Sequence, residues 1–287
     1  MKRLLKRPDY FLILFLTVAY LLGLIQAKGL GRTISLLFFL SGLFFMIGFY
    51  LVVTFAWPEN QFSALDHRAT RSSGSRTEPR ILIMLAAIAL TLVSLFFLIR
   101  AHFFEYLLIP SLLVLLVSSF MALNYSFRAQ SMPYRWLLDS LSISPIAYFF
   151  GLLIAGLEVS FFPFMLAIPL FLIACGSTIS LFFARFQEDL TQQQFPSMQS
   201  INWNRLAQLH DITAFMGYAL LAAYLYFSGA LAIAWPATLM LLAALGCSLL
   251  LHRIINGMHP NWKLLKAMAI VNFIGVMYLL GFAFLTH

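Results

Sequence analysis

Residues 81–100 read ILIMLAAIALTLVSLFFLIR, with nineteen consecutive uncharged residues before the final arginine. A helix needs about 20 predominantly apolar residues to cross the hydrocarbon core of a bilayer. Eight other stretches are comparably apolar, so the pattern predicts an all-α polytopic membrane protein with about nine transmembrane helices. The predicted spans cover residues 10–26, 33–57, 81–100, 104–124, 141–158, 161–184, 207–228, 230–252 and 265–286.

The composition indicates the same class of protein. Hydrophobic residues make up 62% of the 287 residues and charged residues only 10%, whereas a soluble domain carries about 25% charged residues. A single globular core cannot bury that apolar excess, so lipid must be the solvent for most of the chain. The two cysteines, Cys175 and Cys247, lie in apolar runs and are expected to be packing residues. We expect one transmembrane domain over residues 1–287, a helix bundle around a central cavity.

The distribution of basic residues predicts the orientation. With the amino terminus in the cytoplasm, fifteen of the eighteen Lys and Arg residues fall on the cytoplasmic side, where such residues are retained. The carboxyl terminus is then expected on the opposite side of a bacterial-type inner membrane. The net charge of +8 is interpreted as this topology signal plus attraction to anionic lipid, without nucleic-acid binding. The cytoplasmic loops are predicted at residues 58–80, 125–140, 185–206 and 253–264.

Acidic residues are also concentrated on that side, which the basic-residue rule does not require. Eight of the ten fall in cytoplasmic segments, several beside basic residues in the loops at 58–80 and 185–206. This pattern predicts a polar mouth between these two loops. The alternative is ordinary solvated loop charge.

Four local sequences occur in the polar segments in a characteristic order. They are LKRPDY at 5–10, PENQFSALD at 58–66 followed by RSSGSR at 71–76, a segment that begins with Tyr125 and Ser126 and ends with Asp139, Leu141 and Ser142, and DLTQQQFPSMQS at 189–200. In their order and loop placement they resemble the motifs of the UbiA-type intramembrane prenyltransferases. That family also has nine helices, a cytoplasmic amino terminus and functional loops after helices two and six.

The resemblance implies transfer of an isoprenyl group from a polyprenyl diphosphate to a lipophilic or aromatic acceptor. Ionisation of the diphosphate builds negative charge that Mg²⁺, held by carboxylates and phosphate oxygens, neutralises. The implied metal ligands are Glu59, Asp66, Glu188 and Asp189; the implied substrate-binding residues are Arg71, Arg76, Arg128 and Arg135; and the implied catalytic residues are Asp66, Asp189 and Tyr125.

The sequence departs from the family pattern at metal-binding positions. Phe62 and Gln193 stand where the family has aspartates, and Pro133 lies near the position of a phosphate-binding lysine. Three functions therefore remain open. The first is an active prenyltransferase with a reduced carboxylate set. The second is a catalytically inactive relative that binds a prenyl lipid or a quinone. The third is a transporter or membrane scaffold, which would be expected to place more ionisable groups near the bilayer midplane than the single strongly polar Asn272.

Other residues carry two interpretations. Asp211, beside His210, could serve as a base for the acceptor, but an Asp near a helix start is more often a capping residue, and we favour that role. The thirty Phe residues could stabilise an allylic cation, although lipid-facing packing explains most of them. Five prolines fall within predicted spans and are expected to kink them. They are Pro110, Pro145, Pro163, Pro169 and Pro236.

Overall fold

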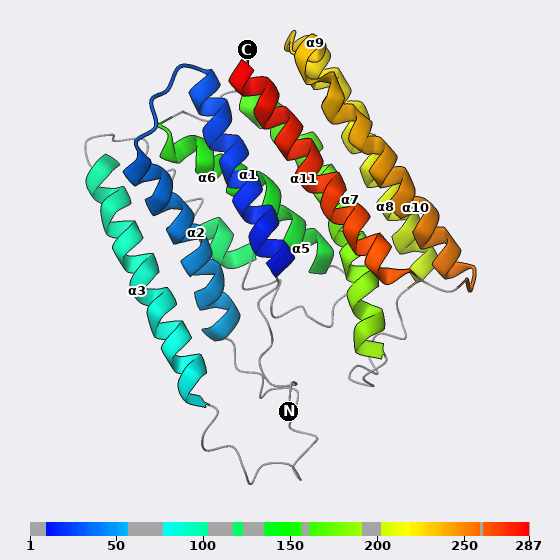
Figure 1. Ribbon diagram of the computed structural model, residues 1–287, viewed down its shortest axis with the longest axis horizontal. Helices are drawn as coiled ribbons and strands as arrows, with labels where there is room; N and C mark the ends of the chain where they lie inside the picture. Colours follow the sequence, from blue (N-terminus) through cyan, green and yellow to red (C-terminus); the bar gives the residue numbers. More distant parts are fainter. Residues whose placement is uncertain are drawn as a thin grey trace.

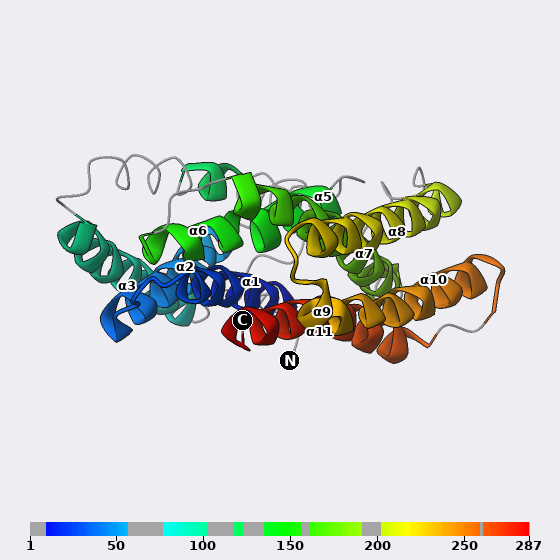
Figure 2. The ribbon, with the colours of Figure 1, turned by 90° about the horizontal axis from the view of Figure 1, so that it is seen from above.

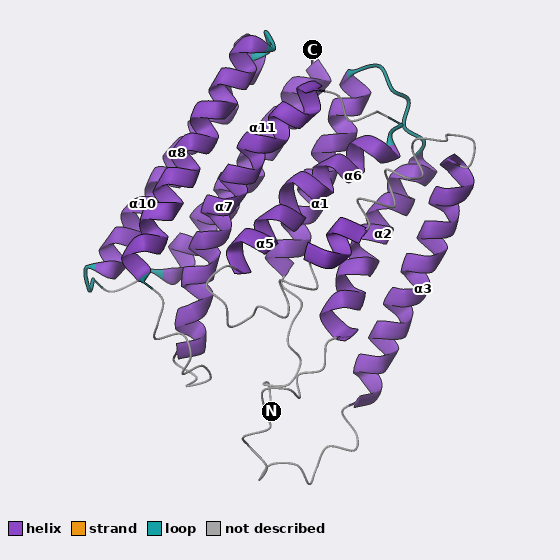
Figure 3. Ribbon diagram, turned by 180° about the vertical axis from the view of Figure 1, so that it is seen from behind, coloured by secondary structure: helices purple, strands orange, loops and turns teal. Residues whose placement is uncertain are grey.

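The protein is described by a computed structural model that covers residues 10–56, 77–102, 117–122, 135–156, 161–190, 202–258 and 261–286. Across these residues the regular structure is helical and no strand occurs, as Figure 3 shows. Among these residues, seven helices are long and apolar enough to cross a membrane. The described part of the chain is therefore an all-helical bundle, and the protein is a multi-pass integral membrane protein.

The helices follow one another along the chain with short irregular insertions. The first half contains α1 (Tyr10–Gly29), α2 (Leu36–Ala56), α3 (Thr77–His102), α5 (Arg135–Leu141), the π-helix η3 (Ser142–Ile146) and α6 (Ala147–Ile154). The second half contains α7 (Phe161–Leu190), α8 (Trp203–Phe227), α9 (Leu231–Ala234), the 3₁₀-helix η5 (Trp235–Met240), α10 (Leu241–Ile255) and α11 (Trp262–Thr286).

Seven of the nine predicted spans correspond to these seven helices. The predicted span at 104–124 lies mostly outside the described residues, and its described part, 117–122, is helical. The predicted span at 207–228 coincides with α8, which has 25 residues but is not among the seven. Its first three turns carry Arg205, His210 and Asp211, which lower its apolar character.

The helices form a flattened bundle (Figures 1 and 2). Seen from above, α3, α2, α1, α11 and α10 line one side, α5, α6 and α8 line the other, and α7 lies between α8 and α11. The start of α1 lies at one end of the bundle, together with the ends of α2 and α7 and the starts of α3, α5 and α8 (Figure 1). We call this the polar end. The end of α11 lies at the opposite end.

Two glycines let α1 and α6 cross in backbone contact. A Cβ atom at Gly151 would collide with the carbonyl oxygen of Tyr20, and one at Gly23 would collide with the carbonyl oxygen of Tyr148. Small residues at such crossings are typical of membrane bundles, because helix association in lipid depends on close van der Waals packing. This contact ties the first helix to the composite α5–η3–α6 helix.

Two of the predicted proline kinks coincide with a change of helix type. Pro145 lies inside the π-helix η3, and Pro236 lies at the start of the 3₁₀-helix η5. Proline has no N–H group, so the usual helical hydrogen bond to the preceding turn is missing there. The long helix α7 begins two residues before Pro163 and continues through Pro169. Pro110 lies outside the described residues.

Replacing Gly151 with valine is predicted to destabilise the protein. The added side chain must push the two backbones apart, and overpacking of this kind costs about 1 to 3 kcal/mol. The check is thermal unfolding of the purified protein in detergent. Ala89→Val is the control, because Ala89 is exposed on α3 and the same kind of enlargement should leave the unfolding temperature unchanged. Equal unfolding temperatures for the two variants would contradict the predicted helix contact.

Candidate functional site

Six of the nine sequence-predicted site residues fall in segments between helices. Glu59, Asp66, Arg71 and Arg76 fall between α2 and α3, and Tyr125 and Arg128 precede α5. All six lie outside the described residues, so their predicted roles remain predictions.

Glu188 and Asp189 lie in the last turn of α7, whose backbone is described although these side chains are not. The end of α7, which carries them, lies at the same end of the bundle as the starts of α3, α5 and α8 (Figure 1). That the predicted carboxylates of the two loops meet there stays a prediction. Arg135 is the one predicted site residue whose side chain is described.

Arg135 is the first residue of α5 and forms an ion pair with a buried carboxylate one turn later. Its Nε atom lies 3.4 Å from Oδ2 of Asp139, and the two side chains are 15% and 8% exposed. Removing either charge alone would leave the other unpaired in a medium of low dielectric constant, which is costly. The predicted phosphate-binding arginine is thus held in place by an acidic residue of its own helix.

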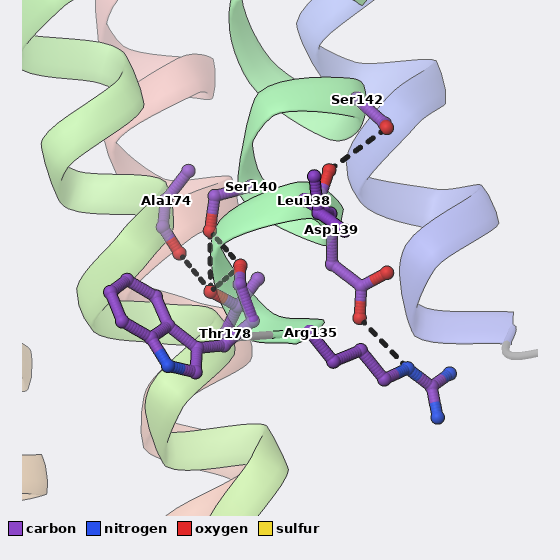
Figure 4. A network of polar contacts seen from close by, with 8 residues as sticks. Arg135, Leu138, Asp139, Ser140, Ser142, Ala174 and Thr178 are labelled. Atoms are coloured by element: carbon purple, nitrogen blue, oxygen red, sulfur yellow. Dashed lines mark hydrogen bonds and ion pairs between the residues drawn. The ribbon is translucent and has the colours of Figure 1, made fainter. Parts of the chain in front are cut away.

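A cluster of hydroxyl groups fixes α5 against α7 behind this ion pair. Oγ of Ser140 lies 2.6 Å from Oγ1 of Thr178 and 2.6 Å from the carbonyl oxygen of Trp136. Thr178 Oγ1 also lies 3.1 Å from that carbonyl oxygen. Figure 4 shows Ser140 directed toward Thr178, while Asp139 and Ser142 point to the other side of α5. The buried ion pair therefore sits on a backbone that hydrogen bonds anchor to α7.

A second polar cluster joins α8 to α10 near the same end. Oδ1 of Asp211 lies 3.1 Å from Nδ1 of His210, and its Oδ2 lies 2.8 Å from Nε2 of His252. An ionised carboxylate only accepts hydrogen bonds, so both ring nitrogens that face it carry a proton. His210 is fully buried, whereas the His252 side chain is 46% exposed.

The predicted capping role of Asp211 is wrong. Asn202 is the N-cap of α8, and its Oδ1 accepts a hydrogen bond from the backbone N–H of Arg205 at 3.1 Å. Asp211 lies in the third turn of α8, where it links two helices. Burial raises the pKa of its carboxyl group, but hydrogen bonds from His210, His252 and Ser248 favour the ionised form more strongly. The net pKa lies below the ordinary value of 3.8.

Deeper in the bundle, the predicted midplane residue Asn272 is part of a third cluster. Its Nδ2 donates to Ser177 Oγ at 3.0 Å, and its Oδ1 accepts from the hydroxyl of Tyr218. The cluster links α11 to both α7 and α8. Asn272 is not the only strongly polar side chain inside the bundle, because Gln26 of α1 is also buried and accepts from the hydroxyl of Tyr148.

Oxygen ligands from Glu59, Asp66, Glu188 and Asp189 would suit Mg²⁺, which prefers carboxylates. Asp139 and Asp211 are the only acidic residues whose side chains the structure describes, and each has a basic or imidazole partner. Within the described residues no cluster of three or more His, Cys, Asp or Glu side chains is placed to hold a metal ion. The side chains of the four predicted ligands lie outside the described part of the chain, so the Mg²⁺ site stays a prediction.

The sequence matches no protein-family model and no curated protein. The resemblance to UbiA-type enzymes therefore rests on the order of the motifs and on their placement at the ends of helices.

Sequence reasoning missed two of these clusters. The hydrogen bond between Asp211 and His252 joins residues 41 positions apart, and that between Tyr218 and Asn272 joins residues 54 positions apart. No local spacing indicates either pair. The only available signal was the presence of ionisable and amide side chains in otherwise apolar segments, which usually have a partner inside the bundle.

Substituting Asp211 with asparagine is predicted to destabilise the protein by about 1 to 3 kcal/mol at pH 7, because two charge-assisted hydrogen bonds are lost. The folded-state pKa is lower than the ordinary value of 3.8, so the carboxylate stabilises the fold above that pH. The stabilisation is lost as the pH falls further toward the folded-state pKa. Thermal unfolding of wild type and variant between pH 7 and pH 3 measures this difference.

The control is Arg205→Gln, which removes an exposed charge from the same helix and should not affect stability at either pH. An Asp211→Asn variant that is as stable as wild type at pH 7 would contradict the structural role of the cluster.

Proposed function

We propose that the protein is a UbiA-like membrane prenyltransferase, which moves an isoprenyl group from a polyprenyl diphosphate to a lipophilic or aromatic acceptor. Two features support the proposal. One is the ordered set of motifs in the polar segments. The other, which carries the proposal in the structure, is the amphipathic layout of the composite helix α5–η3–α6. This helix has a buried charged pair at the polar end and buried aromatic rings further along.

The charged part of this layout suits a diphosphate head group. Arg135 offers a planar set of N–H donors at the polar end, and such a group binds phosphate oxygens in pairs. Burial strengthens this attraction, because partly buried charges are screened less by water and salt. A diphosphate bound here would lie beside the end of α7, which carries Glu188 and Asp189.

The apolar part suits a prenyl chain. Phe150 on α6 stacks with Phe45 on α2 at 5.4 Å between ring centroids, and Phe45 stacks with Phe49 at 5.9 Å. All three rings are buried. Phe150 lies eleven residues after Asp139, about 16 Å along the helix at 1.5 Å per residue. A ligand with a charged head and a long oily tail could meet both regions along one composite helix.

The proposal includes Mg²⁺ bound by Glu59, Asp66, Glu188 and Asp189, which would supply charge neutralisation for the leaving diphosphate. It also includes a nine-span topology with a cytoplasmic amino terminus. In that topology, residues 104–124 and the apolar part of α8 after Asp211 are two further spans, which bring the seven membrane-spanning helices to nine. The polar end then faces the cytoplasm, where a soluble metal ion is available.

A prenyl-lipid or quinone carrier without catalytic activity is the second candidate. Phe62 and Gln193 reduce the supply of carboxylates in the loops, and the two described carboxylates, Asp139 and Asp211, are already held by internal partners. Such a protein would bind the same ligand class without releasing diphosphate.

The proposal predicts Mg²⁺-dependent release of diphosphate from prenyl diphosphates of several lengths by the purified protein in nanodiscs, with a lipophilic or aromatic acceptor present to take the isoprenyl group. Arg135→Gln should reduce release by about tenfold or more, because a charge-assisted phosphate contact is lost. The double variant Asp66→Ala plus Asp189→Ala should abolish the metal-dependent part.

Arg100→Gln is the matched control, because Arg100 is an exposed arginine near the far end of α3 and should not affect release. Prenyl-lipid binding without release, insensitive to a chelator, would overturn the enzyme proposal in favour of the carrier. Solute transport across liposomes without either activity would support a transporter instead.

A further inference from the structure

We infer that Asp139 is a positioning residue, whose carboxylate holds one side of the Arg135 guanidinium so that its two terminal nitrogens face a bound phosphate or diphosphate. This inference deepens the proposed function and rests on it. Asp139 contacts the arginine and not the ligand, so its effect on ligand binding is expected to pass through Arg135.

Within the described residues, the ion pair with Asp139 involves the Nε side of the guanidinium and not its two terminal nitrogens. Nε of Arg135 is buried and makes no hydrogen bond within the described residues, so its contact with Asp139 is an ion pair, while the side chain as a whole is 15% exposed. The exposed part therefore lies elsewhere on the side chain. In Figure 4, the two terminal nitrogens lie farther from the Asp139 carboxylate than Nε does and point away from it.

The chemistry of guanidinium makes this arrangement useful. The group has five N–H donors in one plane, and an oxyanion can bind either the side edge, which includes Nε, or the end edge formed by the two terminal nitrogens. Because Asp139 occupies the Nε side, an incoming phosphate is directed to the end edge. Two parallel hydrogen bonds can form there, which fixes the orientation of the phosphate as well as adding affinity.

The pair also lowers the cost of keeping an arginine in a buried place. A guanidinium without a partner in a low-dielectric region carries a large desolvation penalty. Asp139 offsets this penalty while no anion is bound. The carboxylate itself sits on a short helix that Ser140 and Thr178 fix to α7, so the position of the partner carboxylate is set by the fold.

The test is a double-mutant cycle on the dissociation constants of inorganic diphosphate and farnesyl diphosphate, measured by calorimetry with the full protein in zwitterionic nanodiscs. Arg135→Gln is expected to weaken the binding of both probes by about tenfold or more. Asp139→Asn is expected to weaken it by about fivefold in the wild-type background, and by less than about twofold when Arg135 is already Gln. Asp139→Glu should restore part of the loss.

This coupling separates positioning from a structural role. If Asp139 served only the fold, its substitution would weaken binding equally in both backgrounds, and that result would overturn the inference. Binding that becomes tighter in Asp139→Asn, through relief of charge repulsion, would overturn it too, as would a wild-type protein that binds neither probe. Thermal unfolding identifies any variant that fails to fold, and Asp139→Glu with Arg135→Lys then provides the cycle.

Two further arms identify the ligand and separate the two proposals. Adding an anionic phospholipid to the nanodiscs tests whether lipid head groups occupy the same site. If the lipid weakens binding of the probes and Arg135→Gln removes this effect, lipid phosphate binds the same edge of the guanidinium, which supports the phosphate-binding edge. If the lipid has no effect on binding of the probes, the edge is assigned to diphosphate. Farnesyl diphosphate is also tested for turnover, since inorganic diphosphate has no isoprenyl group to transfer. Coupled binding without release of diphosphate would defeat the proposed enzyme while supporting the role of Asp139. Release without coupling would support the enzyme and defeat the role of Asp139.

Discussion

Lipid offers no hydrogen-bonding partner, so a polar group within a membrane bundle must find one inside the protein. The middle of α7 meets this requirement with three consecutive small residues, Gly176, Ser177 and Thr178, that face three different helices. Gly176 lies against Ala214 of α8. Ser177 accepts a hydrogen bond from Asn272 of α11 at 3.0 Å, and Thr178 contacts Ser140 of α5. A rotation of α7 would break all of these contacts together, so this short segment sets the positions of its neighbours.

The candidate site depends on the same constraint. Thr178 fixes α5, and α5 places Arg135 and Asp139 at the polar end, beside the helix that carries Glu188 and Asp189. On the other side of α7, His210 lies against Gly176 and holds Asp211, which reaches α10. The polar groups thus organise the bundle from its middle to its polar end, while apolar surface alone would allow the helices to slide or rotate in lipid.

Apolar runs and loop polarity predicted the helical class and seven of the membrane helices, because the length of an uncharged stretch is a local property of the sequence. That the motif-bearing segments share one end stays a prediction, because these segments lie mostly outside the described residues. Pairings between helices could not be predicted in this way. Asp211 looked like a cap because its sequence position is near a helix start, but the helix begins earlier, at Trp203, and its partner His252 is far along the chain. The sequence singled out Asn272 as a polar residue in an apolar segment, but only the fold identifies Ser177 and Tyr218 as its partners.

The most direct test of the central claim is a cysteine cross-link between α5 and α7 in native membranes, in a protein whose Cys175 and Cys247 are replaced by alanine. The account predicts a disulfide for Ser140→Cys with Thr178→Cys, because the two hydroxyl oxygens lie 2.6 Å apart. It predicts none for Ser140→Cys with Ser177→Cys, since adjacent residues on a helix face different directions. Equal cross-linking of the two pairs, or cross-linking of the second pair alone, would contradict the arrangement of helices around α7.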